Sequence, residues 1–301
     1  MRTLLWPAAA VFLVAGCSTP PGGGAAAQHR PDPRPLDRVL DVTAAQSAAL
    51  HRAEEQEVRT CMTARGFAYA VRPVSDARRS ATPSPYGLLT ESRARQNGYG
   101  LTVDRLRKRP PDPNARRLAA LNDHDRRVWE AALQGAPDGP REEIALPDGP
   151  TMSVSTDSCV TAATRALYGA SWERNLFTLQ NLANTVVADA LAHPLVRAAE
   201  RKWAACMRDQ GFPYENRQDP LRALEKRLTA AGTDQAALRA TGREELRIAG
   251  QDAACQAESG LAERILRAQN RIEKALPPVR TSVLADVRTA RRRALERAER
   301  A

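Results

Sequence analysis

One nine-residue segment occurs twice in the chain and constrains the fold more than any other feature. The segment CMTARGFAY at Cys61–Tyr69 recurs as CMRDQGFPY at Cys206–Tyr214, 145 positions later. The residues before each copy also correspond, so the same helix is encoded twice and the chain is expected to contain two related halves. The matching positions are Arg52/Arg197, Ala53/Ala198 and Glu55/Glu200.

The glycine and the aromatic residue of the repeat predict how its helix ends. If Gly66 takes the left-handed conformation after the last turn, Phe67 packs on Met62 in a Schellman ending. The cysteine then lies in the last turn of the helix. The same ending is expected at the second copy, with Met207, Gly211 and Phe212.

The first residues of the chain resemble the signal peptide of a bacterial lipoprotein. Arg2 is followed by Leu4–Ala15, an apolar run too short to span a bilayer as a mature helix. The run ends in Val-Ala-Gly-Cys, which resembles a lipobox. The resemblance implies that residues 1–16 are removed, that Cys17 carries diacylglycerol and palmitate, and that residues 17–36 form a flexible tether at the extracytoplasmic face of the cell membrane. The alternative is ordinary secretion with Cys17 as a plain thiol.

Four cysteines follow Cys17, and this even number indicates two disulfides in an exported chain. In each half, a cysteine of the repeated segment is followed by a cysteine that lies two or three residues after an aspartate. This order favours the pairs Cys61–Cys159 and Cys206–Cys255, and the alternative is pairing across the halves. Because no Cys-x-x-Cys pair occurs, zinc-ribbon and thioredoxin-type sites are disfavoured. A thiol-exchange function would instead require one accessible, easily reduced disulfide.

Apolar residues recur at helical spacing through most of the chain, so the expected fold is mainly α. We expect a disulfide-stapled helical domain with two related halves, residues 37–170 and 171–301, and one small β-hairpin over Glu142–Val154. Val71–Pro113 is expected to be a long loop. The predicted helices cover residues 43–65, 114–134, 156–168, 172–191, 194–210, 234–276 (broken near Gly250 or Gly260) and 279–300.

These segments together resemble a family of actinobacterial exported proteins and lipoproteins with no established function. Members carry a W-x-x-C-M-x-x-x-G-[FY]-x-Y helix, a DG hairpin, a C…A…LYG helix and a DA-x-C…GL segment. The resemblance covers most of residues 40–276 and implies no catalytic residue. In this chain, the first copy of the repeated segment departs from the family pattern, because Val58 stands where the second copy has Trp203. The corresponding segments here are Trp203–Tyr214, Asp148–Gly149, Cys159–Gly169 and Asp252–Leu261.

The formal charge of +10 comes almost wholly from arginine and predicts a basic surface. Outside a cell, such a surface favours anionic lipid head groups and wall polymers, and nucleic acid is not an expected partner. The last predicted helix is the candidate contact with an anionic surface, although a helix packed on the domain is equally consistent. Its arginines are Arg288, Arg291, Arg292, Arg293 and Arg297.

The chain contains no established catalytic motif, and the sequence predicts no metal and no cofactor. His124 with Asp123 and Asp125 is a candidate base or metal site, but a solvated helix N-cap is the favoured interpretation. Glu142 and Glu143 are candidates for an acid pair, and edge-strand charge is favoured instead. The remaining candidates are tyrosines, expected to anchor the disulfide corners or alternatively to line a binding groove: Tyr69, Tyr168 and Tyr214.

These features favour a membrane-anchored envelope lipoprotein without catalytic activity. It would bind a wall polymer or an envelope protein, and its oligomeric state is left open. The alternative is a hydrolase that acts on wall glycan or peptide.

Overall fold

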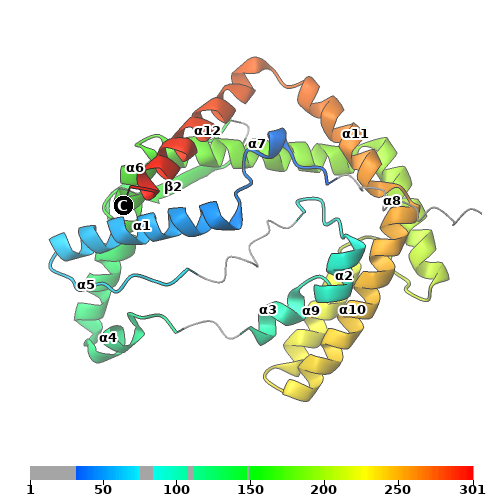
Figure 1. The fold of residues 1–301 in the computed structure, drawn as a ribbon, viewed down its shortest axis with the longest axis horizontal. Helices are drawn as coiled ribbons and strands as arrows, with labels where there is room; N and C mark the ends of the chain where they lie inside the picture. The colour runs from blue at the N-terminus through cyan, green and yellow to red at the C-terminus, as the bar shows by residue number, and fades with distance from the viewer. Residues whose placement is uncertain (1–31, 75–83, 108–110, 148, 301) are drawn as a thin grey trace, which may run out of the picture. The chain divides into compact units, whose positions relative to one another are not determined.

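The computed structural model describes residues 32–74, 84–107, 111–147 and 149–300, which are mainly helical with one hairpin (Figure 1). The predicted fold class is confirmed. Cys17, the expected signal peptide and most of the tether lie outside the described residues, in which no helix is long and apolar enough to cross a membrane. The elements are η1 (Leu36–Arg38), α1 (Ala44–Ala64), α2 (Glu91–Asn97), α3 (Leu101–Leu106), α4 (Ala115–Ala120), α5 (Asp123–Gln134), β1 (Arg141–Ala145), β2 (Thr151–Ser155), α6 (Cys159–Tyr168), α7 (Trp172–Ala192), α8 (Pro194–Asp209), α9 (Asp219–Ala231), α10 (Gln235–Glu258), α11 (Leu261–Lys274) and α12 (Pro278–Ala298).

Local capping decides where several helices begin and end. Thr43 and Gln46 form a reciprocal capping box at the start of α1. The single helix predicted over residues 114–134 is two helices, because Asn122 interrupts it and caps α5 by accepting the Asp125 N–H at 2.8 Å. The break predicted near the end of α10 occurs at Gly260, which has a φ of 64°, whereas Gly250 lies inside α10.

The expectation of a long loop over Val71–Pro113 is wrong in part, because α2 and α3 lie within it. Buried side chains of α10 hold this segment. Glu245 accepts the first two backbone N–H groups of α3 at 2.9 and 2.8 Å, and Gln256 accepts the Leu89 N–H at 3.0 Å. These partners are far away in the sequence, so local periodicity does not reveal them. α9 was also not predicted, although Leu224 and Leu228 lie on its buried face at helical spacing.

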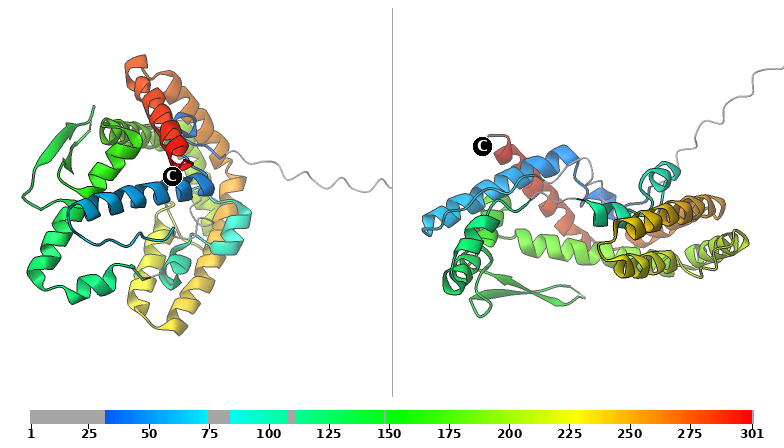
Figure 2. Two further views of the ribbon diagram at one scale, coloured as in Figure 1. Left: turned by 60° about the vertical axis from the view of Figure 1, so that its left-hand side comes forward. Right: turned by 90° about the horizontal axis from the view of Figure 1, so that it is seen from below.

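The helices pack in two groups, and each group contains helices from both predicted halves of the sequence (Figures 1 and 2). α10 packs against α2, α3, α8 and α9, whereas α12 packs against α1, α6 and α7. α11 contacts α7, α8 and α10. Thus α2 and α3 precede residue 170 but pack on α10, and α12 follows it but packs on α1 and α6. The halves are related in sequence, but the core is built from both.

The predicted hairpin is confirmed, with β1 and β2 antiparallel and Ile144 opposite Met152 (Figure 2). Ile144 is almost fully buried and fixes which face of the hairpin is turned inward. The turn is tied to α7, because the Asn181 side chain donates to the Pro147 carbonyl at 3.0 Å. The hairpin therefore packs on the helices at its tip as well as through its buried face.

A left-handed turn at Leu36–Arg38 connects the start of the described chain to the helices. Its three non-glycine residues have φ between 53° and 57°, which costs roughly 1–2 kcal/mol for each residue. Contacts from α11 and α12 offset this strain. Glu273 accepts the Leu36 N–H at 2.7 Å, the Leu36 side chain is buried, and Arg291 donates to two backbone carbonyl oxygens just after the turn.

Both copies of the repeated segment end their helices in the predicted Schellman geometry. In the first copy, the Phe67 N–H donates to the Met62 carbonyl and the Gly66 N–H to the Thr63 carbonyl, each at 2.9 Å. Phe67 packs in the same cluster as the fully buried Met62. The second copy has the same two hydrogen bonds, from Phe212 to Met207 and from Gly211 to Arg208, and both glycines have a φ of 81°.

Replacement of either cap glycine by alanine is expected to destabilise the fold by about 1 kcal/mol. No atom lies within 4 Å of the position that a Cβ would take at Gly66 or Gly211, so the left-handed backbone alone causes the loss. Gly250→Ala is the matched control, because this site is equally open but helical, and alanine is expected to stabilise it by about 1 kcal/mol. Urea unfolding measures all three, and a cap variant that behaves like Gly250→Ala would contradict the assignment.

Candidate functional site

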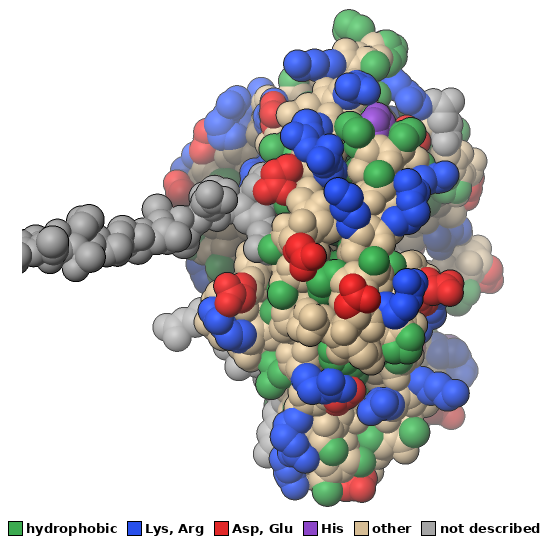
Figure 3. All heavy atoms as spheres, turned by 90° about the vertical axis from the view of Figure 1, so that its right-hand side faces the viewer, with side chains coloured by type: hydrophobic (Ala, Val, Ile, Leu, Met, Phe, Trp, Pro, Cys, Tyr) green, Lys and Arg blue, Asp and Glu red, His purple; other side chains and the backbone are tan. Residues whose placement is uncertain are grey.

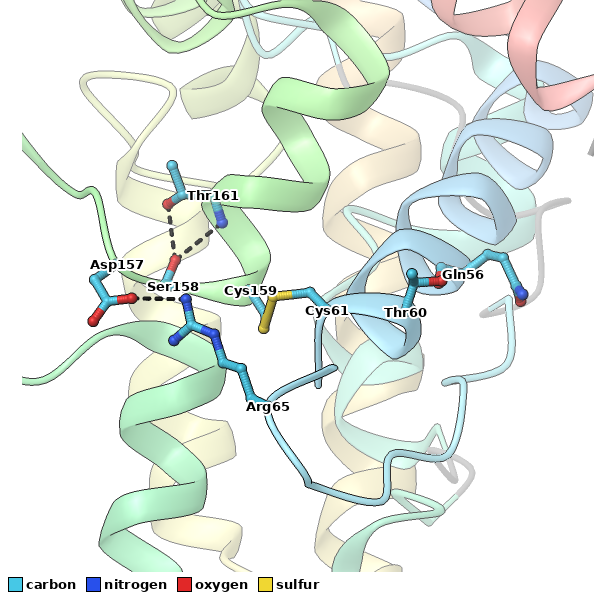
Figure 4. Close-up of a disulfide and its surroundings, with 8 residues drawn as sticks. All are labelled: Gln56, Thr60, Cys61, Arg65, Asp157, Ser158, Cys159 and Thr161. Atoms are coloured by element: carbon cyan, nitrogen blue, oxygen red, sulfur yellow. Dashed lines mark hydrogen bonds and ion pairs between the residues drawn. A yellow bond between two sulfur atoms is a disulfide. The ribbon is translucent and has the colours of Figure 1, made fainter. Parts of the chain in front are cut away.

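The first disulfide joins the last turn of α1 to the first residue of α6, as predicted (Figure 4). The Cα atoms of Cys61 and Cys159 are 5.5 Å apart, and Cys159 is fully buried. Ser158 caps α6 by accepting the Thr161 N–H at 3.0 Å. The Arg65–Asp157 ion pair, at 2.7 Å, adds a second link between the same two segments.

The second disulfide also begins in the repeated helix, but its partner lies in the last turn of a helix and not at a helix start. Cys206 lies in the last turns of α8 and pairs with Cys255 of α10, with 5.7 Å between their Cα atoms. Cys255 is fully buried, as Cys159 is, whereas each cysteine of the repeated segment is half-buried. The predicted pairs are confirmed and pairing across the halves is excluded. Each bond thus has one sulfur shielded by the core.

The two copies also share an ion pair that the sequence analysis missed. Glu55 binds Arg72 at 2.6 Å, and Glu200 binds Arg217 at 2.9 Å. Arg72 and Arg217 are separated by 145 positions, as are the two cysteines of the repeat. Extending the sequence alignment three residues past the final tyrosine of the segment would have found this pair. The repeated unit is therefore a helix, its glycine ending and the extended segment that follows, whose arginine binds a glutamate of the helix.

In the first copy, Glu55 also anchors Tyr69. The Tyr69 hydroxyl donates to this carboxylate at 2.8 Å, and the tyrosine ring stacks on Trp129. Burial raises the pKa of Glu55, but hydrogen bonds from Arg72 and Tyr69 outweigh burial and hold the pKa below its ordinary value. Tyr69 thus serves as an anchor behind the first disulfide, as expected.

The other two tyrosines have different surroundings. Tyr168 stacks on Trp172, with 4.1 Å between the ring centroids, and its hydroxyl donates to Glu54 at 2.6 Å. Tyr214 is half-buried and stacks against Phe212 in the second copy. Tyr168 therefore anchors α6 to α1, and Tyr214 lies at the disulfide corner of α8.

The second half contains a buried carboxylate at the aspartate before its second cysteine, whereas the corresponding Asp157 of the first half is exposed. Asp252 of α10 is 1 % exposed. It accepts three hydrogen bonds from neutral donors: Trp203 at 2.7 Å, Tyr99 at 2.8 Å and Gln256 at 2.9 Å. Burial raises the pKa of Asp252 above its ordinary value, although these hydrogen bonds and the charge of Arg217 oppose the shift. The cluster joins α8, α10 and the segment between α2 and α3.

The first candidate catalytic group lies at the solvent-exposed start of a helix. Asp123, His124 and Asp125 are exposed in the first turn of α5, where Asn122 provides the cap. No group of three His, Cys, Asp or Glu side chains that suits a metal ion occurs in the part of the chain that the structure describes.

The two glutamates of the hairpin do not form an acid pair. Glu142 binds Arg165 at 2.8 Å and Arg174 at 3.1 Å. Glu143 instead accepts a hydrogen bond from Ser153, because successive side chains of a strand point to opposite faces. Each carboxylate is thus held separately.

Three of the five candidate arginines of α12 make contacts within the protein. Arg288 pairs with Asp37 at 3.4 Å, and Arg291 binds the backbone after the left-handed turn. Arg297 donates to two carbonyl groups in the last turn of α6, where a cation is favourable. Arg292 and Arg293 are exposed and have no acidic partner among the described residues. Hence α12 packs on the domain and still presents two arginines to solvent.

The repeated helix α8 presents a second row of arginines. Arg197, Arg201 and Arg208 are exposed and lie along one side of this helix. They form no ion pair with another described residue. Basic side chains are spread widely over the face of the molecule that includes α8 (Figure 3). This row is inconspicuous in the sequence, although its residues belong to the repeat.

Comparison with known proteins identifies no relative. No family model matches the chain, and neither a curated protein nor a solved structure is detectably similar to it. The resemblance to an actinobacterial exported family therefore stays a hypothesis that rests on the motifs alone.

Proposed function

We propose that this protein is a lipoprotein anchored to the extracytoplasmic face of the cell membrane through Cys17. In this role it binds an anionic wall polymer or an envelope protein and performs no catalysis itself. The lipobox-like sequence at Val14–Cys17 supports the anchor. The two disulfides support an oxidising compartment outside the cytoplasm.

The observation that carries the binding role is the presence of arginines without acidic partners on two helices. Arg292 and Arg293 of α12, and the row on α8, are exposed and make no ion pair within the described residues. Many other arginines of this chain are paired with acids or backbone carbonyls, as Arg72 and Arg217 are. Unpaired guanidinium groups add no ion pair to the fold and are suited to external carboxylate or phosphate groups.

Cys17→Ala is expected to move the protein from the membrane fraction to the soluble extracytoplasmic fraction. Two acyl chains anchor a protein durably, and their loss removes about 0.8 kcal/mol for each buried CH₂. Metabolic labelling with a palmitate analogue measures acylation, and fractionation measures the location. Ser18→Ala is the control and should remain labelled and membrane-bound. A Cys17→Ala protein that is still labelled would refute the anchor.

The binding role is tested by pull-down from crosslinked envelopes with the wild-type chain. We expect recovery of wall polymer or an envelope protein well above a bead control, with weaker recovery at high salt because the contacts are ionic. Recovery of neither would contradict the proposal. Degradation of purified wall that is abolished by Asp123→Ala, His124→Ala or Glu143→Ala would favour a hydrolase instead.

A further inference from the structure

Each copy of the repeated unit borders a shallow cavity, open to solvent, at equivalent positions. The first-copy cavity has a volume of about 430 Å³ and the second-copy cavity about 620 Å³. Three positions line both, 145 residues apart: Arg59 and Ala204, Thr63 and Arg208, and Ala70 and Glu215. Both cavities lie between the repeated helix and the chain that returns from its glycine ending. The duplication has therefore produced two hollows of the same origin.

The second-copy cavity is strongly basic. Arg197, Arg201 and Arg208 line it, and none has an acidic partner among the described residues. Glu200 also lines it, but the ion pair with Arg217 neutralises this carboxylate. Glu215, at the rim, is the one lining carboxylate that forms no ion pair with a described residue. Three guanidinium groups thus face one uncompensated acid.

The first-copy cavity is basic through different residues. Arg59 of α1 and Arg117 of α4 line it, and both are exposed without an acidic partner in the described ranges. Among the described residues, no carboxylate lines this cavity. Phe67 and Tyr69 supply an apolar wall. The two cavities are equivalent in position, but the arginines that make them basic stand at positions that do not align between the copies.

We propose that the two cavities are a duplicated binding site for the phosphodiester groups of an anionic wall polymer. Arginine presents a planar fork of N–H donors that matches phosphate oxygens, and several arginines around one hollow can engage one phosphate together. This inference rests on the proposed envelope role and specifies its ligand. A polymer suits these cavities because one chain can lie in an open hollow and present successive phosphates to several guanidinium groups.

Tripolyphosphate binding to the mature chain with Cys17→Ser, which is not acylated, tests the duplication. Isothermal titration calorimetry should find two sites in each protein molecule. Removing two arginines from the second-copy cavity, in Arg197→Ala/Arg201→Ala, should leave one site. The control Arg239→Ala/Arg243→Ala removes an equally spaced, exposed pair from α10 and should leave both sites.

The reciprocal variant Arg59→Ala/Arg117→Ala should also leave one site, with the second-copy cavity unaffected. One site in the wild-type chain, or equal losses in the α10 control and in both cavity variants, would overturn the duplicated site. Circular dichroism checks that each variant is folded. A second series replaces the same cavity arginines by lysine. It should weaken binding less than the alanine variants do, because lysine keeps the charge but lacks the planar fork of donors.

The polymer is tested with the same proteins against purified teichoic polymer and against anionic phospholipid vesicles. Each cavity variant should bind the polymer about tenfold more weakly than the α10 control does, since charge-assisted hydrogen bonds are lost. Vesicle binding should change equally in all variants. If the cavity variants lost vesicle binding but kept polymer binding, the cavities would be lipid sites and the proposal of a polymer ligand would be wrong. If wild-type protein captures an envelope protein but binds no polymer, this inference fails and the proposed envelope role stands.

Discussion

Replacement of Cys61 and Cys159 together by alanine is expected to lower the free energy of unfolding by about 5 kcal/mol. The bond closes a sequence separation of 98 residues, so its loss greatly increases the entropy of the unfolded chain. Cys159 is fully buried, and alanine avoids leaving an unpaired polar group there. Guanidinium unfolding of the variant and of the wild type measures the difference.

The second disulfide provides a comparison within the same protein. The Cys206–Cys255 bond closes a separation of 49 residues. Replacing both cysteines by alanine should lower the free energy of unfolding by about 4 kcal/mol, slightly less than for the first bond. Reduction of the wild type should approach the combined loss. A loss below about 1 kcal/mol for either bond would show that the disulfide is not a major support of its half.

Asp252→Ala is expected to destabilise the protein by about 3 kcal/mol or more. The substitution leaves the buried donors of Trp203, Tyr99 and Gln256 without their acceptor, and each unsatisfied buried donor is costly. Asp252→Asn is the matched variant. Its carbonyl oxygen can still accept from Trp203 and Gln256, and the Tyr99 hydroxyl can turn to accept from the new amide. The asparagine variant should therefore stay within about 1 kcal/mol of the wild type.

The same pair of variants has a defined dependence on pH. Because burial raises the pKa of Asp252 in the folded state, the protonated acid favours folding. This contribution is fully present below the pKa of the unfolded chain, about 3.9, and is lost as the pH rises through the folded pKa. Asparagine does not ionise, so Asp252→Asn does not lose this stabilisation. The stability of the variant relative to the wild type should therefore rise as the pH increases above about 3.9 and through the folded pKa.

Glu55→Gln is the control of opposite sign. The pKa of Glu55 is lowered in the folded protein, so its contribution is present above the unfolded pKa, about 4.3, and is lost as the pH falls through the folded pKa. The glutamine variant should therefore lose stability relative to the wild type near neutral pH and less in acid. Parallel pH profiles for the two variants would contradict at least one of the two assignments, and the sign of the common slope would show which one.

Much of the fold could be predicted because its signals are local. The Met62, Gly66 and Phe67 pattern predicted a helix ending that the backbone hydrogen bonds confirm. The order of the cysteines predicted the pairing, because the chain repeats one unit. The break at Gly260 was one of two alternatives, because the sequence alone treats Gly250 as an equal candidate; in the structure, Gly260 takes the left-handed conformation and Gly250 lies inside α10.

The candidate site was harder to predict because charge in a sequence does not reveal which charges are already satisfied. The arginines of α12 formed the most conspicuous cluster, yet Arg288, Arg291 and Arg297 bind acids or carbonyl oxygens of the protein. Arg197 and Arg201 are less conspicuous in the sequence, but no acid of the described chain reaches them. Pairing depends on which distant segments pack together.

The sequence by itself determined the repeated unit, its helix endings, its disulfides and the basic balance of charge. Each follows from residues within one or two helical turns, or from the order of two copies. Only the tertiary structure decided that α2 and α3 form on α10, that Asp252 is buried among neutral donors, and that each unit borders a basic cavity. The physical reason is that burial, ion pairing and cavity shape depend on contacts between residues far apart in the sequence, such as Leu89 and Gln256, which are 167 positions apart.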